Sequence, residues 1–193
     1  MDRTEEFEDF ARARQGHMRR LAFLLSGDWH DAQDITQTAL LNLCRAWNRA
    51  RRADSVEAYA HRVLVHAYLS QRKKRQRDDV RAADFAVLAD RGANDNGDAG
   101  QPELRITLLS ALAQIAPKGR AVLVLRYWED LSVEATAAAL GCSTGNVKSQ
   151  SSRALARLRE ILGDSLFEEF PEATVPDTGT PIRPAVPATD HGW

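Results

Sequence analysis

The spacing of apolar residues along this chain predicts a succession of amphipathic helices. Between residues 4 and 25 apolar side chains recur at three- and four-residue steps, and Ser26-Gly27 ends the pattern. Asp28 is placed to cap a second helix, whose apolar stripe continues to about Arg49. Four polar side chains of this second helix lie off the stripe: Asp31, Asp34, Gln37 and Arg45.

A third helix begins after Asp54 or Ser55, either of which can cap it, and ends in the basic run RKKRQR. The side chains expected to face inward are its apolar ones: Val56, Ala60, Val63, Leu64 and Ala67. Three amphipathic helices with short connections predict a compact bundle with one core over residues 1–77.

The helical pattern fails between residues 78 and 101, where the run GANDNGDAG offers almost nothing to bury. We interpret this stretch as a flexible linker. The alternative is a calcium loop through Asn94, Asn96 and Asp98, but Gly92 stands where its first acidic ligand belongs. Residues 167–193 are rich in proline and small side chains, so we expect a disordered tail.

A second helical unit is predicted over residues 102–166. Leu104, Leu108 and Leu112 share one side of its first helix, and Pro117 opens the next. Two further helices follow the turn at Glu129-Asp130, so this unit has four helices. The chain is therefore expected to be all-α, with two small helical domains on a linker.

The last two helices of this unit are joined by a tight turn. Ser132 can cap the first, Gly141 can end it in the left-handed conformation, and Ser143 or Thr144 can cap the second. The first helix is expected to pack through Leu131, Ala135, Ala138 and Leu140, and the second through Val147, Ser151, Ala154, Leu155, Leu158 and Leu162. The outward face of the second helix is polar and basic: Asn146, Lys148, Ser149, Ser152, Arg153 and Arg157.

Small alanines in the first helix permit close approach of the pair, as in a helix-turn-helix whose second member enters the major groove of DNA. Hydroxyl, amide and cationic side chains on the outward face suit base edges and phosphates. The alternative is an ordinary helical hairpin with a solvated charged face. We favour DNA binding.

The formal net charge of −1 argues against a protein that coats nucleic acid generally. The distribution of charge changes that picture, because base gathers at residues 72–77 and along the last helix. We expect Arg72, Lys73 and their neighbours in this run to hold phosphates rather than only to solvate a helix end.

Cys44 and Cys142 each lie within an apolar helical pattern, so we expect buried reduced thiols rather than a disulfide or metal pair. No secretory leader or apolar run of bilayer length is found, which favours the cytoplasm. The histidines show no metal-ligand spacing, and neither a phosphate-binding glycine loop nor a nucleophile elbow is present. We therefore expect no enzyme activity, no metal and no cofactor.

Several stretches, in this order, resemble the extracytoplasmic-function sigma factors of the sigma-70 family. DAQDITQTALLNLCRAW is similar to the family's polymerase-binding helix, and AYAHRVLVHAYLSQRKKR to its promoter-melting and −10 reading helix. The stretch from IAPKGRAVLVLRYWEDL to the end of the last helix resembles the −35 reading domain, and LLSGDWHDAQD resembles the SigE-like subgroup. Departures occur at His66, where asparagine is frequent, and at Gln33, where an acid is frequent.

The resemblance implies three sets of site residues. The residues implied to contact the −35 element of the promoter are Ser143, Thr144, Asn146, Lys148, Ser149, Ser152, Arg153 and Arg157. The residues implied for reading and melting the −10 element are Arg51, Arg52, Ser55, Tyr59, Arg62, His66, Arg72 and Lys73. The chemistry of Trp47 and Tyr68 would also allow stacking on separated bases, but each aromatic taken alone is expected to be a core residue. Core polymerase is contacted through Asp31, Asp34, Gln37 and Arg45.

The implied function is that of an RNA polymerase sigma factor, with core polymerase and promoter duplex as partners and an anti-sigma factor as a possible third. One alternative is a helix-turn-helix regulator that binds a palindromic operator as a dimer. Another is a helical adaptor with no DNA dependence.

Overall fold

The computed structural model describes residues 3–82 and 102–163, and helices account for nearly all of this part of the chain, with no strand in either range. The all-α prediction is confirmed. The linker expected over residues 78–101 lies mostly outside the described residues, as do the alternative calcium loop and the expected tail.

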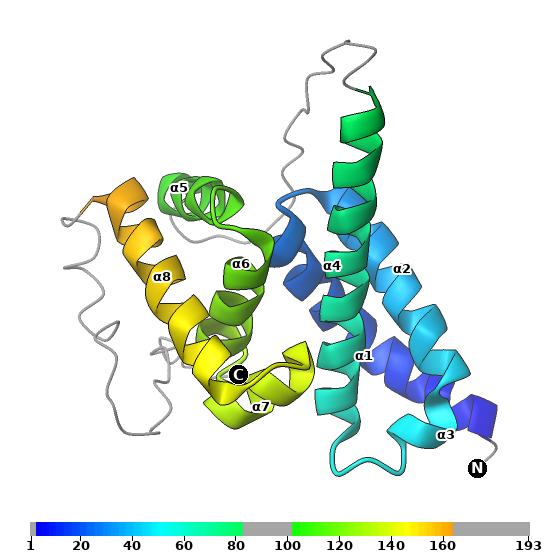
Figure 1. Ribbon diagram of the computed structural model, residues 1–193. Coiled ribbons are helices and arrows are strands. Elements are labelled where there is room, and N and C mark those ends of the chain that lie inside the picture. Colours follow the sequence, from blue (N-terminus) through cyan, green and yellow to red (C-terminus); the bar gives the residue numbers. More distant parts are fainter. Residues whose placement is uncertain (1–2, 83–101, 164–193) are drawn as a thin grey trace, which may run out of the picture.

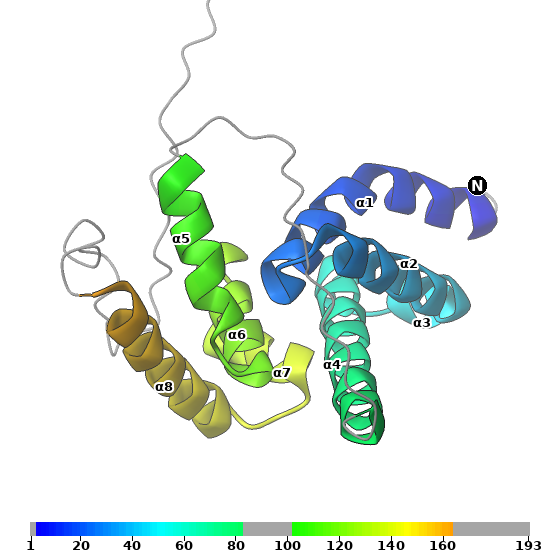
Figure 2. The same cartoon turned by 90° about the horizontal axis from the view of Figure 1, so that it is seen from above.

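The N-terminal half contains three long helices and one short one (Figures 1 and 2), namely α1 (Arg3–Ser26), α2 (Trp29–Arg45), α3 (Trp47–Ala50) and α4 (Val56–Ala82). Asp28 caps α2 as predicted, because its Oδ1 accepts the backbone N–H of Asp31 at 2.8 Å. The predicted second helix is interrupted at Ala46, whose φ and ψ of −99° and 10° depart from helical values. Helix α4 continues to Ala82, beyond the domain boundary expected at residue 77.

The C-terminal half contains α5 (Pro102–Ala113), α6 (Pro117–Leu123), η1 (Val124–Trp128), α7 (Val133–Leu140) and α8 (Thr144–Leu162). The segment η1 is one turn of π-helix that continues α6 directly. Helices α7 and α8 form the predicted helix-turn-helix, with Ser132 and Ser143 as caps. Gly141 ends α7 at φ 64°, a conformation that any side chain would strain.

The inward face predicted for α8 is confirmed, since Val147, Ala154, Leu155 and Leu158 are buried. The face predicted for α7 is confirmed at Leu131 and Leu140, which pack against the core, and is wrong at Ala138, which is exposed. The buried positions are Thr136, Ala137 and Ala139. The reason is that α7 lies between α4 and α8 and contacts both, so it is covered on two sides.

The two halves of the chain share their largest hydrophobic cluster. Leu25, Leu64 and Tyr68 of the N-terminal helices are fully buried in the same cluster as Ala121 and Leu125 of the C-terminal helices. Figure 1 shows α4 beside α7 at this junction, and the helix contacts agree. The sequence predicts two separate units and gives no sign of this packing.

Arg120 on α6 is a buried cation at this junction, with 2% of its surface exposed. Its Nη1 donates to the carbonyl oxygen of Leu25 on α1 at 2.7 Å. Its Nη2 donates to the carbonyls of Ala113 at 2.5 Å and Ile115 at 3.2 Å. Burial lowers the pKa of Arg120, and the three carbonyl acceptors offset the cost of removing its guanidinium from water.

The prediction of two buried thiols is wrong for Cys44, which is exposed, while Cys142 is half-buried. Cys44 follows the fully buried Leu43 by one position. One residue turns the side chain about 100° around a helix, which carries it off the buried stripe.

Candidate nucleic-acid interface

Helix α8 presents a continuous outer face of exposed polar and cationic side chains. We call it the reading face; it comprises Asn146, Lys148, Ser149, Ser152, Arg153 and Arg157. It is opposite the buried row through which α8 packs on α5, α6 and α7. Within the described ranges Lys148 and Arg153 form no ion pair, whereas Arg157 binds the exposed Glu160 at 2.9 Å.

Two residues of the predicted −35 set lie at the start of α8 rather than on the reading face. Ser143 uses its Oγ to accept the backbone N–H of Asn146 at 3.2 Å, so its hydroxyl is engaged as a helix cap. Thr144 is the first residue of the helix and is exposed. The capping role of Ser143 limits what its side chain can offer to a base.

Arg62, His66 and Lys73 are exposed on α4 and share one side of it, because residues four and seven apart align along a helix. They belong to the predicted −10 set. Arg72 of the same set is half-buried, so only part of it remains available.

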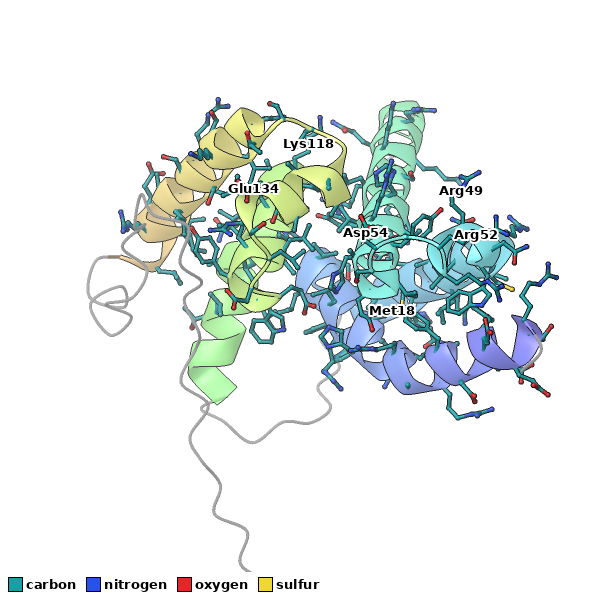
Figure 3. All side chains as sticks on the ribbon, turned by 90° about the horizontal axis from the view of Figure 1, so that it is seen from below. Met18, Arg49, Arg52, Asp54, Lys118 and Glu134 are labelled. Carbon is teal, nitrogen blue, oxygen red and sulfur yellow. The ribbon has the colours of Figure 1, made fainter. Side chains whose placement is uncertain are left out.

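The connection between α3 and α4 carries the other polar members of the predicted −10 set. Arg52 is exposed at the end of the molecule away from α8 (Figure 3). Arg51 instead binds Glu6 of α1 at 2.9 Å. Ser55 accepts the backbone N–H of Ala58 at 3.1 Å and thereby caps α4.

The aromatic candidates for base stacking are mostly core residues. Trp47 is 5% exposed and packs against the rings of Phe7 and Phe10. Tyr68 is completely buried. Tyr59 is half-buried at the edge of the Trp47 cluster, so it retains one accessible side. The expectation that each aromatic taken alone is a core residue is therefore confirmed for Trp47 and Tyr68, and neither ring is accessible to a base in this packed conformation.

Asp31, a predicted polymerase-binding residue, and Arg75, which belongs to the basic run expected to hold phosphates, bind each other. The carboxylate of Asp31 accepts two hydrogen bonds from the guanidinium of Arg75, and Asp31 is 8% exposed. The hydrogen bonds to Asp31 raise the pKa of Arg75. Asp31 is thus not on the surface as the polymerase-binding prediction requires, and Arg75 is not free to hold a phosphate.

The remaining polymerase-binding candidates form one exposed side of α2, where Asp34, Gln37 and Arg45 are all exposed. Leu41 lies on the same side and is 59% exposed, one of two large hydrophobic side chains that are exposed in the described ranges. Sequence reasoning missed Leu41, which lies two positions from the buried Ala39 and Leu43 and therefore falls on the outer face of α2.

Three side chains from distant parts of the sequence meet where the two halves join. We call them the His–Glu cluster: His17 of α1, His61 of α4, and Glu129 at the end of η1. The Oε2 atom of Glu129 is 2.9 Å from His17 Nε2 and 2.8 Å from His61 Nε2. Burial raises the pKa of Glu129, but hydrogen bonds from His61 and then His17 outweigh it and lower the pKa overall.

These features define a two-part helical protein whose helix-turn-helix exposes a basic face suited to DNA. Two family models match it: Sigma-70 region 2 over residues 10–78, and Sigma-70, region 4, over residues 105–158. Together they cover more than half of the chain. The chain belongs to the sigma-70 family of RNA polymerase sigma factors.

Named relatives agree with this assignment. The chain is 40% identical to the RNA polymerase sigma-E factor of Streptomyces coelicolor, over 84% of this chain and 89% of that protein. It is 32% identical to the ECF RNA polymerase sigma factor SigM of Mycobacterium tuberculosis, over 81% of this chain and 77% of that protein. The sigma factor RpoE of Bartonella quintana, solved in complex with the anti-sigma factor NepR, superimposes with a TM-score of 0.69 at 26% identity, covering 82% of this chain and 97% of RpoE.

None of the helices described for residues 3–82 and 102–163 has both the length and the apolar content needed to cross a bilayer.

Proposed function

We propose that this chain binds core RNA polymerase and directs it to promoters whose −10 and −35 elements are read by different helices. The observation that carries the proposal is the reading face of α8, on which Lys148 and Arg153 are exposed and make no ion pair within the described ranges. The polymerase supplies the chemistry of RNA synthesis, and this chain acts in the cytoplasm without catalysis of its own.

The reading face is assigned to the −35 duplex. Asn146, Lys148 and Arg153 carry the groups that bind base edges in the major groove: a carboxamide for adenine, and cations for guanine. Arg157 lies about one to three turns further along α8 than these residues and is assigned to a phosphate. Ser149 and Ser152 are short enough to let the helix approach the base pairs closely.

The side of α4 that carries Arg62, His66 and Lys73 is assigned to the −10 element, together with Arg52. Tyr59 and His66 are the rings on this side with accessible surface, so they are the candidates for stacking on separated bases. The exposed side of α2 with Asp34, Gln37, Leu41 and Arg45 is assigned to core polymerase, because an apolar centre with charged neighbours is the usual composition of a protein interface.

The packed arrangement of the two halves is a closed form. Elements at −10 and −35 are separated by about 25 base pairs, or about 85 Å of straight duplex at 3.4 Å per step. Helix α7 contacts both α4 and α8, so the axes of α4 and α8 are about 20 Å apart where each contacts α7, at 8–10 Å per helix contact. The two halves must therefore separate before both elements of one promoter can be read.

An anti-sigma factor is assigned as a third partner, supported by the complex of RpoE with NepR. A dimeric operator-binding regulator finds no support in the comparisons, because the matches extend over the N-terminal helices that such a regulator does not need.

The proposal is tested by transcription in vitro with purified core polymerase and a library of promoters. The wild-type chain is expected to select promoters with two dissimilar elements. Asp34→Arg should weaken association with core polymerase, whereas Glu8→Arg, the same charge reversal on the exposed side of α1, should not. Selection of a palindromic site by the chain alone, without polymerase, would establish the regulator instead.

A further inference from the structure

We propose that the His–Glu cluster is a binding site for a divalent transition metal, with zinc as the best fit, and that the metal fastens the two halves of the chain together. The cluster consists of His17, His61 and Glu129, whose ligand atoms all lie within 4.8 Å of one another. Neither the family matches nor the relatives' names point to a metal in this position.

The chemistry of the three side chains fits zinc. Two imidazole nitrogens and one carboxylate oxygen form a ligand set that zinc uses with a water as fourth ligand. In a tetrahedral site with bonds of about 2.1 Å, neighbouring ligand atoms are about 3.4 Å apart. The 2.8 and 2.9 Å contacts of Glu129 Oε2 are near this spacing, so movements of roughly 1 Å at the side-chain ends suffice.

The surroundings allow a metal to enter and then be shielded. The side chains of Glu129 and His61 are only 7% and 13% exposed, whereas that of His17 is 36% exposed. Solvent therefore reaches the cluster from the His17 side, which supplies both an entry path and the fourth ligand. The rings of His17 and His61 lie beside each other, with centroids 6.4 Å apart.

The backbone presents Glu129 to the two histidines through an irregular turn. The N–H of Glu129 bonds to the carbonyl of Val124 at 3.1 Å, the wider spacing of the π-helix. Asp130 follows with φ 50°, a left-handed conformation that non-glycine residues seldom adopt. Turns of π-helix are frequent at functional sites, and this one gives the C-terminal half its ligand.

The surroundings of the second ring nitrogen of His61 determine how tightly the site should bind a metal. The Nδ1 atom of His61 is buried without a hydrogen-bond partner in the described part of the chain. When Nε2 binds a metal, Nδ1 carries the proton and finds no acceptor, and loss of such an outer partner typically weakens binding about 10- to 100-fold. The site is thus suited to reversible occupation rather than to permanent structural zinc.

The ligands come from both halves, with two from the N-terminal helices and one from the C-terminal half. A metal that needs all three binds only the packed arrangement and stabilises it by mass action. Metal binding by the cluster does not depend on the proposed function. The consequence for promoter reading does, because zinc would then favour the closed form.

The test uses the full chain, freed of metal and kept reduced, titrated with zinc against a chromophoric chelator. One zinc per chain is expected, with affinity at least tenfold weaker in His17→Asn, His61→Asn and Glu129→Gln. His30→Asn, an exposed histidine of α2, and Cys44→Ser are the matched controls and should bind like wild type. Failure of the wild type to bind zinc, or a loss that follows either control instead of the cluster, overturns the site.

Since a substitution at buried Glu129 can unfold the chain, two measurements use the wild type. Cobalt(II) in the same site should give the visible absorption of a four-coordinate nitrogen and oxygen ligand set; thiolate charge-transfer bands would overturn the assignment. Zinc should also slow amide hydrogen exchange in α1 and η1, which contact each other at the junction. If zinc bound without slowing exchange in these segments, the proposal that it holds the two halves together would be wrong.

Discussion

Two basic regions of this chain look alike in sequence and differ in the structure. The end of α4 carries RKKRQR, and α8 carries cations from Lys148 to Arg159. On α4 Arg75 is held by Asp31 and Arg72 is half-buried, which leaves Lys73, Lys74 and Arg77 as its exposed cations. On α8 Arg157 binds Glu160, whereas Lys148 and Arg153 are exposed and form no ion pair within the described ranges. The density of cations therefore does not identify a DNA-binding surface. A surface whose cations lack internal acceptors is the better indicator, because such charges need not lose a partner when DNA binds.

The largest effect is expected where a cation is entirely internal. Arg120→Met removes three hydrogen bonds to carbonyl oxygens at the junction and leaves those acceptors without partners. We expect the free energy of unfolding to fall by about 3–5 kcal/mol, measured by urea denaturation with circular dichroism. Arg153→Met, the same change on the reading face, should alter it by no more than about 0.5 kcal/mol. Equal losses in the free energy of unfolding at Arg120 and Arg153 would contradict the distinction between internal and surface cations.

The second effect concerns promoter binding. Arg153→Ala should weaken binding of holoenzyme to duplex promoter by about 1–3 kcal/mol and relax preference at a single −35 position. The measurement is competition among promoters that differ at one base pair. Arg12→Ala removes an exposed arginine of α1, where its partner is Asp9, and should leave the preference unchanged. A uniform loss on all promoters with Arg153→Ala would reassign this residue to a phosphate.

A smaller effect is expected at the partly buried ion pair between Asp31 of α2 and Arg75 of α4. Asp31→Asn leaves Arg75 with a neutral acceptor in a partly buried site, where the arginine and aspartate side chains are 32% and 12% exposed. We expect a loss of about 1–2 kcal/mol in the free energy of unfolding. Glu160→Gln breaks an ion pair whose side chains are 53% and 65% exposed and should cost at most about 0.5 kcal/mol. A larger cost at Glu160 than at Asp31 would remove the distinction between the two cations.

Local signals in the sequence predicted most of the fold. Caps at Asp28, Ser132 and Ser143 and the left-handed Gly141 all occur where the residue types place them. These features depend on neighbours within four residues, which a sequence displays directly. The reading face was predictable for the same reason, since helical periodicity alone separates its exposed and buried sides.

The features that the sequence did not predict depend on contacts between residues far apart in the chain. Asp31 is buried because Arg75 lies 44 residues beyond it, and no local pattern shows that pairing. The faces of α7 depend on its contact with α4, and the His–Glu cluster depends on an unforeseen contact between the two halves. Glu129 is moreover aimed by a π-helical turn, which the apolar spacing of α6 does not predict.

The smallest effect distinguishes two cations within the reading face itself. Arg157 binds Glu160 at 2.9 Å, and both side chains are exposed, so exchanging that partner for a phosphate costs little. Arg157→Ala should therefore lower holoenzyme affinity less than tenfold at a fixed salt concentration, and equally on all promoters. Its signature is the salt dependence: the slope of log affinity against log salt should fall by about one, because one fewer counterion is released. Glu160→Gln, which keeps Arg157, should leave the slope unchanged. If Arg157→Ala changed promoter preference instead of the slope, α8 would enter the groove further along its length than the assignment of Arg153 implies, and the base-reading and phosphate-holding roles would have to be exchanged.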